Sequence, residues 1–169
     1  ILGAACIYIE GKRESLLVSG DVSVGDQRTI PGMVIPRCRP DVAVLEATYG
    51  NRRHADRAQQ EAALVEKVAE VIEAGGKVLI PAFAVGRAQE VILILARAVR
   101  QGRMPPFPVW IDGMVRAVNA VYASFPEILA PSLRRRIEKG ERPFYTDFIR
   151  PVSRARERDQ VLDGPPCCI

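Results

Sequence analysis

Histidine and cysteine, the side chains that most often bind transition metals, are scarce in this sequence of 169 residues, which contains one histidine and four cysteines. A hydrolytic zinc site takes about three protein ligands, mostly imidazoles, so we do not expect the chain by itself to be a competent zinc hydrolase. The cysteines form no CxxC pair and no spaced ligand set, which argues against a zinc ribbon and against a disulfide framework. We therefore expect reduced thiols and a cytoplasmic protein. The four are Cys6, Cys38, Cys167 and Cys168.

Long apolar runs are also absent. No stretch approaches the roughly 18 apolar residues that suggest a membrane-spanning helix, so we expect no membrane partner. Charged residues between Glu10 and Glu14 interrupt the start, so we do not expect it to be a secretory signal peptide. The chain starts at Ile1 inside an apolar run and stops at Ile169 shortly after a Gly-Pro-Pro turn signal. We interpret it as an excerpt of a longer protein.

The composition is that of a globular protein. Hydrophobic residues make up 48% and charged residues 26%, which argues against wholesale disorder. The net charge of +4 suits a polyanionic partner, although many enzymes of small molecules have a similar charge. The length allows one large domain or two small ones with a buried core.

Residues 1–48 are rich in strand signals. Residues 4–10 and 15–19 are β-prone runs separated by a Gly-Lys turn signal, which is the spacing of a hairpin. A polar loop over residues 20–40 follows. Residues 41–45 then form a continuous apolar run, which predicts a strand buried on both faces.

From residue 51 onward, helix and strand signals alternate with short loops, which is typical of a parallel sheet with helices on its faces. Asp56 and Gln59 have the spacing of a capping box at a helix start, and Gly75-Gly76 is a helix stop. The helix that opens at Gly86 is apolar on most sides, so we expect it to be sandwiched. The sequence thus predicts an α/β fold. Strands are expected at 77–81, 108–111, 143–148 and from about 166, and further helices at 115–125, 132–139 and 153–162.

Two carboxylates stand at predicted strand ends, where ligands of such sheets bind. Asp21 follows Ser19-Gly20, and it is either a turn or cap residue or a metal ligand held rigidly at a cleft. Glu46 closes the apolar run at 41–45, where a buried carboxylate is costly unless it is paired or lies at a cleft mouth. From the residues alone, structural and functional roles stay open for both.

Basic residues gather in two further places. His54, the single histidine, lies just before a helix start, and together with Arg52, Arg53 and Arg57 it could contact phosphate. Arg87 opens the helix after Gly86, at a helix N-terminus whose free N–H groups suit a phosphate. The glycine spacing there matches neither a P-loop nor a dinucleotide fingerprint. A structural ion pair is the alternative role for Arg87.

Taken in order, these segments resemble the β-CASP branch of the metallo-β-lactamase superfamily. The resemblance is to the RNA-processing nucleases, which include the nuclease subunit of the cleavage and polyadenylation specificity factor and its bacterial and archaeal relatives. It runs the length of the chain, strongest from Asp41 to Leu95 and weak after Phe125. It rests on the succession of Ile1–Ala5, Ser19–Ser23, Pro40–Gly50, His54, Arg57 and Leu79–Glu90.

The resemblance implies roles for individual residues. Asp21 matches the aspartate that bridges two zinc ions, and Glu46 matches the acidic residue that hydrogen-bonds a histidine of the catalytic site. Residues 1–48 would be part of a metallo-β-lactamase αββα half, and residues 49–169 an incomplete β-CASP domain with a mainly parallel sheet flanked by helices. The implied reaction is hydrolysis of an RNA phosphodiester bond by a metal-activated water. Single-stranded RNA would contact Arg87 and the loop with Arg52, Arg53 and His54.

Other functions compete with this prediction. A DNA-repair nuclease of the same superfamily typically has aspartate where this chain has Glu46, and it differs around residues 86–90. A catalytically silent RNA-binding paralogue would lack metal ligands that the family places outside this chain. An unrelated α/β enzyme of small molecules would require the whole succession of motifs to be a coincidence. The resemblance leaves endo- or exonucleolytic cleavage, RNA sequence preference and oligomeric state open, with a homodimer among the options.

Overall fold

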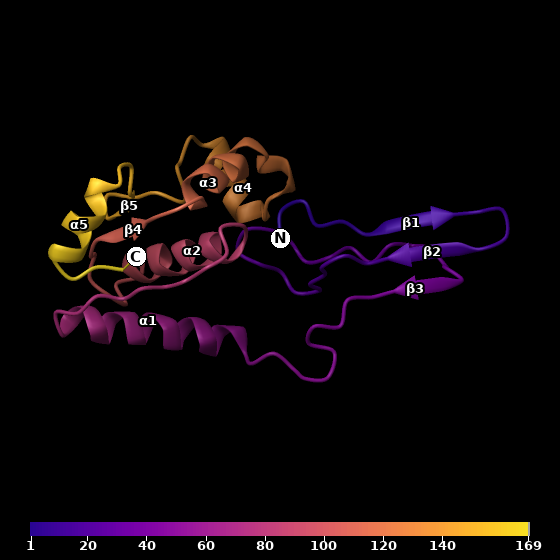
Figure 1. Cartoon of the computed structure of the whole chain (residues 1–169), viewed down its shortest axis with the longest axis horizontal. Helices are drawn as coiled ribbons and strands as arrows, with labels where there is room; N and C mark the ends of the chain where they lie inside the picture. Colours follow the sequence, from indigo (N-terminus) through magenta and orange to yellow (C-terminus); the bar gives the residue numbers. More distant parts are fainter. Residues whose placement is uncertain (169) are drawn as a thin grey trace.

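The computed structural model describes residues 1–168, which form a strand arm and a helical body (Figure 1). The strand arm consists of β1 (Ile7–Glu10), β2 (Ser15–Val18) and β3 (Val42–Val44). The helical body spans residues 57–168. Its elements are α1 (Arg57–Glu73), α2 (Arg87–Arg100), β4 (Val109–Ile111), α3 (Val115–Ser124), a 3-10 turn (Pro126–Ile128), α4 (Pro131–Glu138), β5 (Ile149–Pro151) and α5 (Arg156–Asp163).

The predicted hairpin at the start of the chain is confirmed. β1 and β2 pair antiparallel, with Ile7 opposite Val18 and Glu10 opposite Ser15. β3 then pairs with β2 in parallel, with Val18 opposite Val44. The carboxylate of Asp41 fixes this register, because it accepts hydrogen bonds from the backbone N–H and the hydroxyl of Ser15, at 2.8 and 2.7 Å.

The prediction that residues 41–45 are buried on both faces is wrong for this structure. Val42, Val44 and Leu45 expose 53%, 54% and 64% of their surface. Within residues 1–168, β3 is an edge strand paired with β2 alone, and the arm projects away from the helices (Figure 1). The apolar run therefore predicted the strand correctly. Its burial would require further elements packed against β3, and residues 1–168 do not provide them.

The two long helices begin where their caps predict. The carboxylate of Asp56 accepts a hydrogen bond from the backbone N–H of Gln59 at 2.9 Å, which satisfies one of the free donors of α1. Gly86 caps α2 with φ = +86°, a conformation that glycine adopts without strain. Residues on every side of α2 are buried, so the predicted sandwiching is confirmed.

The helical body has a small parallel sheet. β4 pairs with β5 in parallel, and Cys168 forms parallel bridges with both Val78 and Val109. The predicted strand at 77–81 is reduced to the single bridge of Val78. The predicted final strand is likewise a bridge at Cys168, and Ile169 lies outside the described residues.

The strand predicted at 143–148 is wrong, because those residues form a turn and the strand begins at Ile149. The hydroxyl of Thr146 accepts the N–H of Ile149 at 3.1 Å, which closes the turn. Phe144 is buried there, edge-on to Tyr122 with 5.9 Å between ring centroids. Position 144 is therefore apolar because its side chain packs in the core, and not because it belongs to a sheet.

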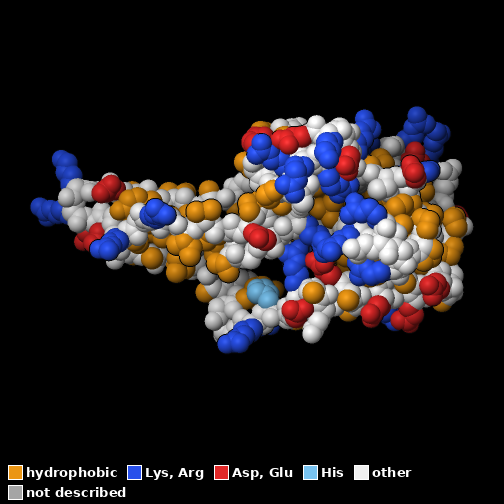
Figure 2. Space-filling model, turned by 180° about the vertical axis from the view of Figure 1, so that it is seen from behind, with side chains coloured by type: hydrophobic (Ala, Val, Ile, Leu, Met, Phe, Trp, Pro, Cys, Tyr) orange, Lys and Arg blue, Asp and Glu red, His pale blue; other side chains and the backbone are white. Residues whose placement is uncertain are grey.

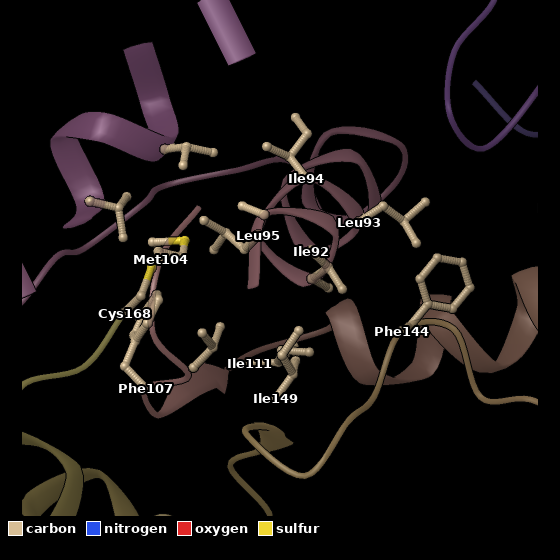
Figure 3. Packing of buried hydrophobic residues seen from close by; sticks show 14 of the residues in the cluster. Ile92, Leu93, Ile94, Leu95, Met104, Phe107, Ile111, Phe144, Ile149 and Cys168 are labelled. Atoms are coloured by element: carbon tan, nitrogen blue, oxygen red, sulfur yellow. The ribbon is translucent and has the colours of Figure 1, made fainter. Parts of the chain in front are cut away.

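The core lies between α2 and the small sheet. Leu95 and Ala98 of α2 are fully buried. Ile111 and Ile149 of the sheet belong to the same core cluster and lie on the side of α2 that carries Ile92 and Leu95 (Figure 3). The α/β fold class is confirmed. The division into a metallo-β-lactamase part and a β-CASP part stays a prediction.

Candidate functional site

The carboxyl ends of β2 and β3 lie at the same edge of the arm, because the two strands are parallel neighbours. Ser19, which is 2% exposed, joins the ends. Its N–H donates to the carbonyl of Val44 at 3.0 Å, and its hydroxyl oxygen accepts the N–H of Glu46 at 3.0 Å. The backbone leading to Asp21 and the backbone of Glu46 are therefore held side by side.

Asp21 is exposed at this edge. It follows Gly20, whose φ of +58° and whose approach to the carbonyl of Ala5, 2.9 Å from where a Cβ would lie, both require glycine. Within residues 1–168 the carboxylate of Asp21 makes no hydrogen bond and no ion pair. It caps no turn there, and both its oxygens are available to a ligand.

Glu46 is also exposed, so the expected penalty for burying its charge does not arise. One carboxylate oxygen accepts the backbone N–H of Thr48 at 3.0 Å, which holds the side chain close to its own loop. The second oxygen makes no hydrogen bond within the described residues. It can accept one from an imidazole N–H.

The loop after Glu46 is organised around the ring of Tyr49. The guanidinium of Arg52 stacks over that ring, 4.8 Å from its centroid, and the ring of His54 lies 4.5 Å away, tilted by 52°. Arg53 is exposed next to them. Figure 2 shows the histidine beside a hollow between the arm and the helical body, with Lys and Arg side chains gathered on the opposite rim.

Arg87 and Arg57 have different surroundings. Arg87 is exposed at the start of α2, and its side chain forms no ion pair within residues 1–168, so the structural role that competed with phosphate binding is not found there. Arg57 is instead occupied by carboxylates. It forms ion pairs with Glu61, at 3.0 Å, and with Glu90.

Sequence reasoning missed the cluster to which Arg57 belongs. Its centre is Glu90, whose side chain is 7% exposed, and it includes Arg28 and Thr29 from the polar loop between β2 and β3. A glutamate inside an apolar helix was the one available signal, because such a charge has to be paired. Nothing in the loop indicated which of its residues would reach that helix.

The charged groups in this cluster shift one another's pKa values. Burial by itself would raise the pKa of Glu61, but hydrogen bonds from Arg28 and Arg57 outweigh it and hold the pKa below its usual value. Burial alone would lower the pKa of Arg57, whereas its contacts with Glu61 and Glu90 raise it. Both groups therefore stay charged at neutral pH.

Of the expected metal site, the described residues include one proposed ligand, Asp21. Asp21 fits the role of a ligand, because its carboxylate is exposed and unpaired at a rigid strand end. Residues 1–168 contain no group of three or more His, Cys, Asp or Glu side chains arranged to hold a metal ion. They also contain no helix long and apolar enough to cross a membrane.

Known proteins resemble the whole chain. An RNase J-like protein of Methanocaldococcus jannaschii is 38% identical to it over 173 residues, covering 100% of this chain and 39% of that protein. The transcription termination factor FttA of Methanosarcina mazei is 35% identical, covering 100% of this chain and 27% of that protein. FttA of Pyrococcus horikoshii is also 35% identical, over 97% of this chain and 26% of that protein. No protein-family model matches the chain.

The chain is therefore homologous, over its whole length, to a part of these archaeal proteins. The resemblance to β-CASP nucleases of the RNA-processing branch is thereby confirmed. The chain spans well under half the length of these relatives.

Proposed function

We propose that this chain is part of a zinc-dependent ribonuclease, with residues 1–48 contributing to a metallo-β-lactamase domain and residues 49–169 to a β-CASP domain. The observation that carries the proposal is the parallel pairing of β2 and β3, with Ser19 joining their ends. It brings Asp21 and Glu46, the two residues to which the resemblance assigns catalytic-site roles, to one edge. The names of the homologues, RNase J-like and termination factor, agree with RNA as the substrate.

Each carboxylate has its own task in this proposal. Asp21 would hold the metal, together with ligands from outside residues 1–168. Zinc, when bound, lowers the pKa of a coordinated water toward neutrality and takes up charge on the phosphate oxygens. The free oxygen of Glu46 would accept a hydrogen bond from a histidine, fixing the ring so that it can protonate the leaving oxygen of the RNA. The chain thus supplies a ligand and a positioning carboxylate.

The loop around Tyr49 would guide single-stranded RNA to this edge. Arg52, Arg53 and Arg87 offer charge to phosphates, while the tilted ring of His54 can stack on a base. Each cation that contacts phosphate makes binding weaker as salt rises, because it releases a condensed counterion. The loop should therefore contribute both affinity and salt dependence.

The first test is Asp21→Ala in the full-length protein. We expect loss of RNA cleavage together with a lower zinc content by elemental analysis. Asp147→Ala is the matched control, since Asp147 is also exposed and its carboxylate makes no hydrogen bond within the described residues. Normal turnover by the Asp21→Ala protein would refute the assignment.

The second test is Arg52→Ala, measured as equilibrium binding of a single-stranded RNA at several salt concentrations. The logarithm of the binding constant falls linearly with the logarithm of the salt concentration, and removing one phosphate contact should make that slope shallower by about 0.7. Arg13→Ala at the tip of the β1–β2 hairpin is the control, because it removes the same charge far from the loop. An unchanged slope for Arg52→Ala would remove this loop from the RNA path.

The same assays distinguish the proposed function from two alternative functions. A DNA-repair nuclease would cleave a single-stranded DNA better than an RNA of matched sequence. A silent RNA-binding paralogue would bind RNA but contain no zinc and cleave neither strand.

A further inference from the structure

Glu90 holds part of the loop between β2 and β3 against the helical body. One carboxylate oxygen accepts the N–H of Thr29 at 2.8 Å and its hydroxyl at 2.7 Å. The other accepts the N–H of Arg28 at 3.1 Å and the guanidinium of Arg57. Four donors thus converge on one carboxylate that is almost fully buried.

Further bonds extend this contact within α1 and to the start of α4. Arg28 pairs with Glu61 of α1, which also accepts from Arg57 at 3.0 Å. The carbonyl of Thr29 accepts the N–H of Ala130, directly before α4, at 2.8 Å. We call Arg28, Thr29, Arg57, Glu61 and Glu90 the latch, because they fasten one loop to α1, α2 and α4.

The position of the latch in the chain links it to the candidate site. The loop that it holds begins at the end of β2, passes through Asp21 and returns to β3, which ends beside Glu46. The other partners of this loop are α1, α2 and the start of α4, and Arg87 is the first residue of α2. The latch therefore connects the edge that carries the two carboxylates to α2, which begins with the proposed RNA contact Arg87.

We propose that Glu90 is a positioning residue of the nuclease. It sets the spacing between the edge that carries Asp21 and Glu46 and the proposed RNA contacts, which are Arg87 and the loop around Tyr49. The inference rests on the proposed function. Opening the latch leaves Asp21 and Glu46 joined through Ser19, so the metal edge itself stays intact. A long RNA has to bridge both parts and loses its alignment, whereas a small phosphodiester needs the metal edge alone.

Three variants of the full-length protein separate these effects. Glu90→Gln replaces one oxygen with an NH2 group, which then faces two donors whichever way the amide is turned. Thr29→Val removes the hydroxyl donor and nearly preserves the volume, and Thr29→Ser restores that donor. Glu138→Gln is the matched control, since it breaks an exposed ion pair with Arg134 outside the latch.

The measurement compares kcat/KM for a single-stranded RNA with that for bis(p-nitrophenyl) phosphate. We expect Glu90→Gln and Thr29→Val to lower the RNA value by about tenfold to a hundredfold and to leave the small substrate within about twofold. Thr29→Ser and Glu138→Gln should match the wild type on both. Equal losses on the two substrates, or no loss on RNA, would overturn the proposal.

Amide hydrogen exchange distinguishes failure of this inference from failure of the proposed function. The N–H groups of Arg28 and Thr29 donate to Glu90, so they should exchange faster in Glu90→Gln and not in Glu138→Gln. A wild type that cleaves neither substrate would overturn both proposals, while the exchange rates would still report whether the latch closes. An active wild type with unaltered substrate ratios in the variants would overturn this inference alone.

Discussion

Replacing Gln89 by alanine should destabilise the start of α2 strongly. Gln89 is fully buried, and its side chain makes three hydrogen bonds. Its oxygen accepts the N–H of Gly86 at 2.8 Å, and its amide donates to the carbonyl of Ala84 at 3.0 Å and to the side chain of Asn119 at 2.8 Å. These bonds fix the turn that precedes Arg87.

The magnitude follows from the groups that the substitution leaves unsatisfied. A buried donor or acceptor without a partner destabilises by about 1–3 kcal/mol, and Gly86 and Ala84 would each contribute one such group. We therefore expect a loss of about 2–6 kcal/mol in the free energy of unfolding. The side-chain oxygen of Asn119 would lose its partner as well, so the loss should lie toward the upper end of this range.

The assay is urea unfolding of the 169-residue chain, followed by the fluorescence of Trp110, its only tryptophan. Gln60→Ala is the matched control, because Gln60 is an exposed residue of α1 with no side-chain hydrogen bond within the described residues. A difference below about 1 kcal/mol between the two variants would refute the reasoning, because it would mean that Gln89 does not satisfy the turn.

Three further predictions concern stability and use the same unfolding assay. Gly86→Ala should lose more than Gly102→Ala: both have positive φ, which disfavours alanine by about 1–2 kcal/mol, but only at Gly86 would the new Cβ lie 2.8 Å from Ile1; equal losses would contradict this. Leu95→Ala should lose about 2–5 kcal/mol, because Leu95 is fully buried, and a loss typical of a surface site would contradict the packing. The folded-state pKa of Glu61 lies below its usual value of 4.5, so its ion pairs stabilise the fold above that pH and cease to do so as pH falls through the folded pKa. Glu61→Gln should therefore lose less stability than the wild type on acidification, and identical pH profiles would contradict the pairing.

Local signals predicted much of the helical body. The Asp56 cap, the stop at Gly75 and the Gly86 start depend on a few neighbouring residues, and the structure confirms all three. Segments whose conformation depends on distant partners were harder to predict. Residues 77–81 read as a strand but form one bridge, and Phe144 looked like a strand residue although it packs in a turn.

The candidate site likewise has residues that local signals predict and residues whose partners lie far away in the chain. Asp21 and Glu46 could be singled out because strand ends and family motifs are local features of the sequence. The partnership of Glu90 with Thr29 could not, because the two residues lie far apart in the chain and the loop has no periodicity that would indicate its docking face. The stacking of Arg52 and His54 on Tyr49 lay within one short loop, but no propensity rule predicts it.

The claim on which the function depends is that Asp21 binds metal at the edge it shares with Glu46. Anomalous diffraction at the zinc edge from crystals of the full-length protein measures this directly. We expect two zinc peaks with an oxygen of Asp21 about 2.0–2.2 Å from zinc and Glu46 on the same side of the cleft. Zinc peaks away from Asp21, or a carboxylate of Asp21 engaged in an unrelated ion pair, would contradict the account.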